Sequence, residues 1–88
     1  MKTILEKLKK HATNLMLRGA YLYTQLENLE KDLTDDILIP AYKHDRAENC
    51  YKYIQQYTKS KFHTKMDENE QALWEELIKA SGVEVTND

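Results

Sequence analysis

Glycine, proline and cysteine are scarce in this chain of 88 residues, which contains two glycines, one proline and one cysteine. An all-β fold needs many turns, and turns use glycine and proline, so their scarcity argues against that class. A single cysteine cannot form an internal disulfide, and no apolar run approaches the roughly 18 residues that span a bilayer. The sequence begins MKTILEKLKKHA, which lacks the apolar stretch of a signal peptide. We therefore expect a cytoplasmic, all-α protein with a single domain and no membrane span.

Leucine recurs at alternating steps of three and four residues through the first third of the chain. Small or apolar residues occupy every step of this pattern: Leu5, Leu8, Ala12, Leu15, Gly19, Leu22, Leu26, Leu29 and Leu33. The spacing is that of a coiled-coil seam over four heptads. It predicts one continuous helix over residues 3–33, with Gly19 as the alternative point at which the segment divides into two helices. In the continuous helix, Ala12 and Gly19 form two notches that can accept bulky side chains.

Two further helices are predicted after this segment. Proline is tolerated only near a helix start, so Pro40 and the preceding capping residues predict a second helix over residues 37–61. Asp67 as an N-cap, with Glu70 three residues later, predicts a third helix over residues 67–81, followed by a tail at 83–88. The expected architecture is a small hairpin or bundle of three helices built on one long N-terminal helix.

The leucine seam also predicts self-association. A chain of this length has limited capacity to bury a four-heptad seam together with the apolar faces of two other helices. Residues 1–18 carry a net charge of +4 and residues 19–36 a net charge of -4, so an antiparallel pair of first helices would place opposite charges together. We therefore expect a homo-oligomer, most simply a dimer. The residues expected to form its interface are the leucines at the heptad d positions, Leu8, Leu15, Leu22 and Leu29.

No residue pattern in the sequence indicates catalysis or metal binding. No histidine or cysteine pair has the spacing of zinc ligands, and Cys50 falls on the expected apolar face of the second helix. Phosphate-binding loops and nucleophile elbows need several glycines, and no such motif is present. We expect a protein that is not an enzyme and that uses no metal and no cofactor.

Tyrosine accounts for six of the eight aromatic residues. Tyrosine is favoured in protein interfaces because it buries a large area with little loss of rotamer entropy while its hydroxyl stays hydrogen-bonded. The alternative interpretation is that a thin helical protein places tyrosine at the edge of its core. We expect a non-catalytic interaction protein, such as an inhibitor, adaptor or regulator, that binds a protein partner through a Tyr-rich helical surface. The residues expected to contact that partner are Tyr42, Lys43, Arg46 and Tyr53.

Two other functions are compatible with the same residues. The segment 42–65 interleaves lysine with tyrosine, a pattern found in nucleic-acid-binding regulators. The acidic third helix can instead fold over this segment and neutralise it, because residues 37–66 carry +4 and residues 67–88 carry -6. A small-ligand binder, with its pocket between protomers, is the remaining alternative.

Overall fold

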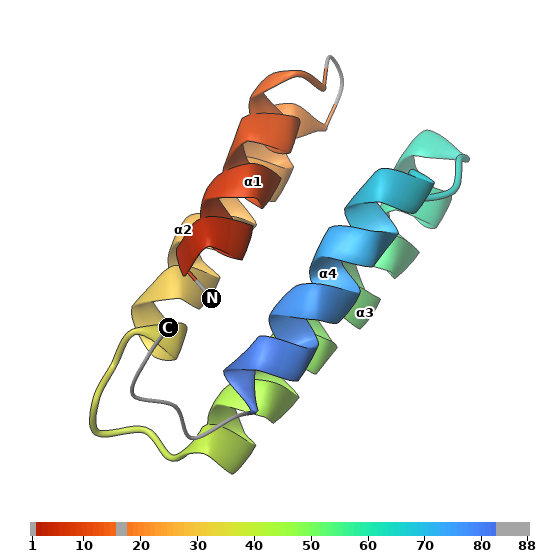
Figure 1. Cartoon of the computed structure of the whole chain (residues 1–88). Helices are drawn as coiled ribbons and strands as arrows, with labels where there is room; N and C mark the ends of the chain where they lie inside the picture. The colour runs from red at the N-terminus through yellow and green to blue at the C-terminus, as the bar shows by residue number, and fades with distance from the viewer. Residues whose placement is uncertain (1, 16–17, 83–88) are drawn as a thin grey trace.

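The computed structural model describes residues 2–15 and 18–82, which form four α-helices (Figure 1). Their bounds are Lys2–Thr13 for α1, Gly19–Leu33 for α2, Pro40–Phe62 for α3 and Glu68–Ser81 for α4. The helices α1 and α3 each pack against both α2 and α4, and the molecule measures 38 × 21 × 20 Å. The all-α class is confirmed, whereas the architecture of three helices on a long N-terminal helix is wrong. In the described ranges, no helix has the length and apolar character needed to cross a bilayer.

The segment predicted as one helix over residues 3–33 is two helices that fold back on each other (Figure 1). The cause lies at Gly19, the first residue of α2. A Cβ atom at this position would lie 2.2 Å from the carbonyl oxygen of Ala12, so only glycine permits this close approach of the two backbones. Ala12 and Gly19 therefore face each other, and neither is a notch for an aromatic side chain.

The leucines predicted to bind a second copy form the core of a single chain. Leu8, Leu22 and Leu29 are 0% exposed, and Leu15 packs half-buried at the core edge. The other helices complete this core with a further set of buried side chains, among them Ala47, Cys50, Ile54, Trp74 and Leu77. Three of the four leucines are thus inaccessible to another molecule, and their assignment to a self-association surface is corrected. Self-association itself stays a prediction, without these residues as its interface.

The helices α3 and α4 begin and end close to their predicted positions. Pro40 is the first residue of α3, where its missing N–H group is not needed, and His63 ends the helix in the left-handed conformation. Asp67 caps α4, because its carboxylate accepts a hydrogen bond from the backbone N–H of Asn69 at 2.6 Å. The tail predicted at 83–88 lies outside the described residues.

Candidate functional site

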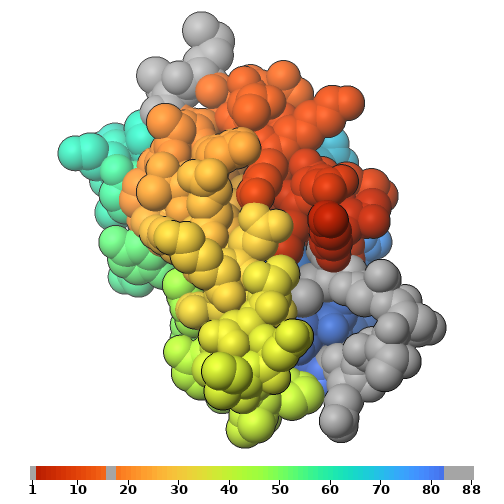
Figure 2. All heavy atoms as spheres, turned by 90° about the vertical axis from the view of Figure 1, so that its left-hand side faces the viewer, coloured from red at the N-terminus to blue at the C-terminus, as the bar shows by residue number. Residues whose placement is uncertain are grey.

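Large apolar side chains are exposed at the point where α2 passes into α3. Ile37 is 88% exposed, Ile39 is 64% exposed and Tyr42 is 47% exposed. The segment that carries the two isoleucines forms the lower end of the molecule in Figure 2, where it is yellow to yellow-green. We call Ile37, Ile39 and Tyr42 the apolar corner.

The backbone of the apolar corner is fixed by local hydrogen bonds. The Asp35 carboxylate accepts a hydrogen bond from the backbone N–H of Ile37 at 2.9 Å, which closes a turn of the kind that aspartate favours. Ile39 has the extended conformation (φ -76°, ψ 154°) that a following proline imposes. Leu38 lies between the two exposed isoleucines and is half-buried, and its backbone N–H donates a hydrogen bond to the carbonyl oxygen of Asp35 at 3.3 Å. The apolar corner is therefore held in place by Asp35 and Pro40.

The four residues predicted to contact a protein partner fall into separate parts of α3. Tyr42 belongs to the apolar corner, and Lys43 is half-buried next to it in the chain. The Arg46 guanidinium donates from Nε to Asp32 Oδ2 at 2.8 Å, so it joins α3 to α2. Tyr53 is 55% exposed and lies eleven residues beyond Tyr42, roughly 16 Å along the helix axis. The structure does not bring Tyr42 and Tyr53 into contact with each other.

Tyr53 belongs instead to an aromatic cluster between α2 and α3. Tyr21 stacks on Tyr57 with ring centroids 3.9 Å apart, and Tyr53 lies 6.4 Å from Tyr21 and 6.5 Å from Tyr57. Burial, followed by the neighbouring Tyr53, raises the pKa of Tyr21 far above its ordinary value. Tyr21 and Tyr57 are half-buried, as the interpretation of tyrosine as a core-edge residue predicts, whereas Tyr53 keeps much of its ring accessible.

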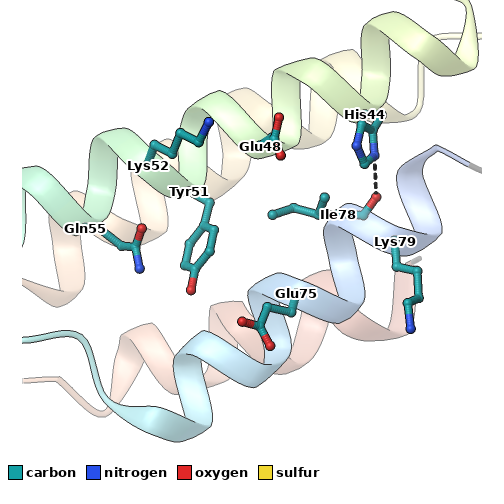
Figure 3. A pocket seen from close by; sticks show the side chains of 8 residues that line it. All are labelled: His44, Glu48, Tyr51, Lys52, Gln55, Glu75, Ile78 and Lys79. Atoms are coloured by element: carbon teal, nitrogen blue, oxygen red, sulfur yellow. Dashed lines mark hydrogen bonds between the residues drawn. The ribbon is translucent and has the colours of Figure 1, made fainter.

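A groove of about 440 Å³ lies between α3 and α4 (Figure 3). Tyr51 and Ile78 point into it from opposite helices, and the Tyr51 ring stacks on Trp74 at 5.7 Å. His44 Nδ1 lies 3.0 Å from the carbonyl oxygen of Ile78, and since a carbonyl oxygen only accepts, Nδ1 is the donor. Burial, and then the nearby Glu75, raise the pKa of Tyr51. The groove is formed within one chain, unlike the pocket between protomers that was the third expectation.

The charges on the groove select neither an anion nor a cation. Glu48 and Lys52 come from α3, and Glu75 and Lys79 come from α4, so two carboxylates and two ammonium groups line the same space. A ligand of either sign would meet both attraction and repulsion there. The groove therefore indicates no ligand class.

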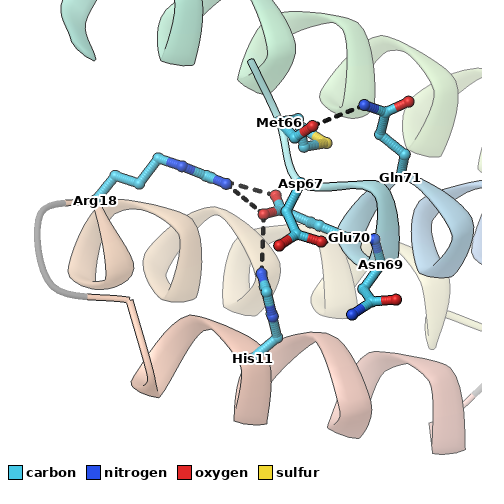
Figure 4. A network of polar contacts seen from close by, with 7 residues as sticks. All are labelled: His11, Arg18, Met66, Asp67, Asn69, Glu70 and Gln71. Carbon is cyan, nitrogen blue, oxygen red and sulfur yellow. Dashed lines mark hydrogen bonds and ion pairs between the residues drawn. The ribbon is translucent and has the colours of Figure 1, made fainter. Parts of the chain in front are cut away.

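A buried ionic network ties the α1–α2 connection to α4 (Figure 4). Glu70 is 0% exposed, and its carboxylate accepts hydrogen bonds from both terminal nitrogens of Arg18, one of them at 3.2 Å. His11 Nε2 lies 3.2 Å from Glu70 Oε1. Glu70 is 52 residues from Arg18 and 59 residues from His11 in the sequence, so the network joins distant parts of the chain. It can hold helices in register, and it presents no nucleophile beside the histidine that would indicate catalysis.

This network was not predicted, because the spacing of Asp67 and Glu70 indicated a role for Glu70 in helix capping. The structure shows that Asp67 caps α4 and that Glu70 is turned into the core. The signal was present in the spacing, since Glu70 precedes Trp74 and Leu77 by four and seven residues on the buried face of α4. A carboxylate in an apolar stripe predicts a buried cationic partner.

The remaining groups that could carry chemistry are possible metal ligands and the thiol of Cys50. Within residues 2–15 and 18–82, no three His, Cys, Asp or Glu side chains are grouped so that they could hold a metal ion. Cys50 is buried, and burial raises the pKa of its thiol despite the opposing effect of Arg46. A raised thiol pKa disfavours the reactive thiolate. That the protein is not an enzyme stays a prediction.

No protein-family model, curated protein or solved structure matches this chain. Its functional interpretation therefore rests on its own surfaces.

Proposed function

We propose that this protein is a non-catalytic helical interaction protein, acting as an inhibitor, adaptor or regulator, and that it binds a protein partner through the apolar corner. The observation that carries the proposal is the exposure of Ile37, Ile39 and Tyr42 on one rigid segment. Scattered exposed apolar residues are ordinary in proteins, but here three large ones fall within six consecutive positions.

The physical basis is the free energy that the patch gains on burial. Covering one exposed isoleucine side chain contributes about 1.5 to 3 kcal/mol, and the apolar corner has two of them beside an exposed tyrosine. The turn at Asp35 and the restriction imposed by Pro40 order the segment before binding. Ordering in advance reduces the conformational entropy lost on association.

The proposal is tested by site-specific photocrosslinking in extracts of cells that express the protein naturally. A benzophenone amino acid replaces Tyr42 in one variant and Ala72, an exposed residue of α4, in the control variant. We expect a discrete crosslinked protein from position 42 that is missing from position 72. An excess of unlabelled wild-type protein should abolish this product, whereas the variant Ile37→Ser/Ile39→Ser should fail to compete.

Two results would contradict the proposal. One is the same set of products from positions 42 and 72. The other is full competition by Ile37→Ser/Ile39→Ser, after circular dichroism has shown that this variant is folded. Because both isoleucines are exposed, their replacement is expected to leave the free energy of unfolding within about 0.5 kcal/mol of wild type.

A further inference from the structure

The C-terminal half of α3 and the turn after it carry only positive charges. The sequence from Asn49 to Met66 contains four lysines and no acidic residue. All four lysines are exposed, namely Lys52, Lys59, Lys61 and Lys65. The acidic helix α4 does not neutralise them through ion pairs, since within the described ranges no carboxylate oxygen lies within 4 Å of any of these four ammonium groups. A polyanion is therefore the kind of partner that this surface attracts.

Helical periodicity places an exposed tyrosine between the lysines. At 3.6 residues per turn, Lys52 and Lys59 project from α3 in nearly the same direction, away from the buried Cys50 and Ile54, whereas Lys61 projects about half a turn from them. Tyr53 falls between these two directions, roughly a quarter turn from Lys52 and from Lys61, and is 55% exposed. We call Lys52, Tyr53, Lys59 and Lys61 the basic face.

The neighbouring helix supports this arrangement without adding charge. Residues 19–26 of α2 contain no ionisable acid or base other than tyrosine. Tyr21 and Tyr57 pack beside Tyr53 and hold the aromatic cluster together. An anion that approaches Tyr53 from the α2 side therefore meets no carboxylate on that part of α2.

We infer that the basic face binds single-stranded nucleic acid, with its lysines on phosphates and the Tyr53 ring stacked on a base. An acidic protein or a sulfated sugar needs only the lysines, whereas a nucleic acid supplies both phosphates and flat bases. Lys52 and Lys59 are about 10 Å apart along the helix axis. A single strand is required because bases inside a duplex do not present their faces to a side chain. This inference concerns a surface other than the apolar corner and does not rest on the proposed function.

The first test uses fluorescence anisotropy with a fluorescein-labelled oligothymidylate of about twelve nucleotides and the full-length protein. We expect a dissociation constant of about 1 to 100 µM at about 50 mM salt, with affinity falling steeply as salt is added. The variant Lys59→Gln/Lys61→Gln should bind more weakly and reduce the slope of log K against log salt by about 1.4, or 0.7 for each lost phosphate contact. The matched control Lys7→Gln/Lys31→Gln removes two exposed lysines from α1 and α2 and should change affinity less than about twofold.

The second test separates base stacking from charge. Tyr53→Ala should lower the affinity for the oligothymidylate by about 5- to 150-fold, whereas Tyr53→Phe, which keeps the ring, should bind like wild type. A duplex of the same length should bind more weakly than the single strand. The inference is overturned if no binding occurs at about 50 mM salt with protein at about 1 mM, well above the usual non-specific range. It is equally overturned if folded Tyr53→Ala binds as wild type does, if the control lysines matter as much as Lys59 and Lys61, or if the duplex binds as tightly.

Discussion

Glu70 is a charged residue inside the core of the bundle. Its carboxylate is fully buried and is compensated by the Arg18 guanidinium, which is itself 7% exposed. Burying an ion pair costs desolvation energy that the attraction between the charges only partly returns. The pair therefore contributes less to net stability than to the choice of one packing, in which Arg18, next to the first residue of α2, lies against the N-terminal part of α4.

Removing one partner of this pair should be strongly destabilising. Glu70→Ala leaves Arg18 buried without its counter-charge, so we expect a loss of about 3 to 5 kcal/mol in the free energy of unfolding. Glu76→Ala, at an exposed position of the same helix, should change it by less than about 0.5 kcal/mol. Urea denaturation followed by circular dichroism measures both. Equal stability of the two variants would show that the Arg18–Glu70 pair is not buried in solution.

Tyr21 makes the stability of the protein sensitive to alkaline pH. Its pKa in the folded chain is raised by burial above the value of about 10 that tyrosine has in an unfolded chain. Above pH 10 the unfolded chain releases a proton that the folded chain retains, so stability is complete below about pH 10 and falls as pH rises beyond it. Tyr21→Phe should reduce the fall measured by urea denaturation between about pH 9 and 11. Tyr42→Phe, at an exposed tyrosine outside the aromatic cluster, is the control, and an identical fall in both variants would argue against a buried Tyr21.

At the scale of the elements, the fold depends on the break between α1 and α2. The two antiparallel helices are joined by an ion pair between Lys9 and Glu30, and Glu30 raises the pKa of Lys9. Gly19 sets how closely α2 approaches the end of α1.

Gly19→Ala should change the stability of a continuous helix and of the α1–α2 hairpin in opposite directions. Inside a continuous helix, alanine would stabilise the protein by about 1 kcal/mol relative to glycine. In the hairpin, the added Cβ would lie 2.2 Å from the Ala12 carbonyl oxygen, which is backbone and cannot move alone. We expect a loss of about 1 to 3 kcal/mol or more from this overpacking. Thermal and urea denaturation of Gly19→Ala beside wild type provide the comparison, and an increase in stability would favour the continuous helix.

The elements that could be predicted from sequence are those with local signals at their ends. Pro40 and Asp67 act within one turn of their own helices, so the starts of α3 and α4 were close to the predictions. The break before Gly19 could not be distinguished in the same way. In this chain the heptad pattern runs through the break unchanged. The leucines that would form the seam of one long helix instead face each other across the hairpin. Choosing between the two requires knowing what lies 2 to 4 Å from Gly19, which is tertiary information.

At the scale of the whole molecule, the surfaces proposed to bind partners are those left outside the bundle. Tyr42 and Tyr53 were predicted from residue type and are exposed, whereas Arg46 is engaged with Asp32. Ile37 was not among the predicted partner contacts. Its exposure follows from the turn at Asp35, which directs the chain around the end of the bundle. The apolar corner and the basic face are thus products of the assembled fold rather than of any one helix.

The central claim is that the leucine seam is closed within one chain, so that binding depends on these outer surfaces. Electron paramagnetic resonance between spin labels at Lys2 and Lys31, both exposed, tests it most directly in a Cys50→Ala background. Labelled protein is diluted with unlabelled protein so that only distances within one molecule are measured. In the hairpin, with adjacent helix axes about 8 to 10 Å apart, we expect a label separation under about 25 Å. A separation near 44 Å, as 29 residues of continuous helix at 1.5 Å each require, would contradict this claim. The leucine seam would then not be closed by a hairpin and would be accessible to another molecule.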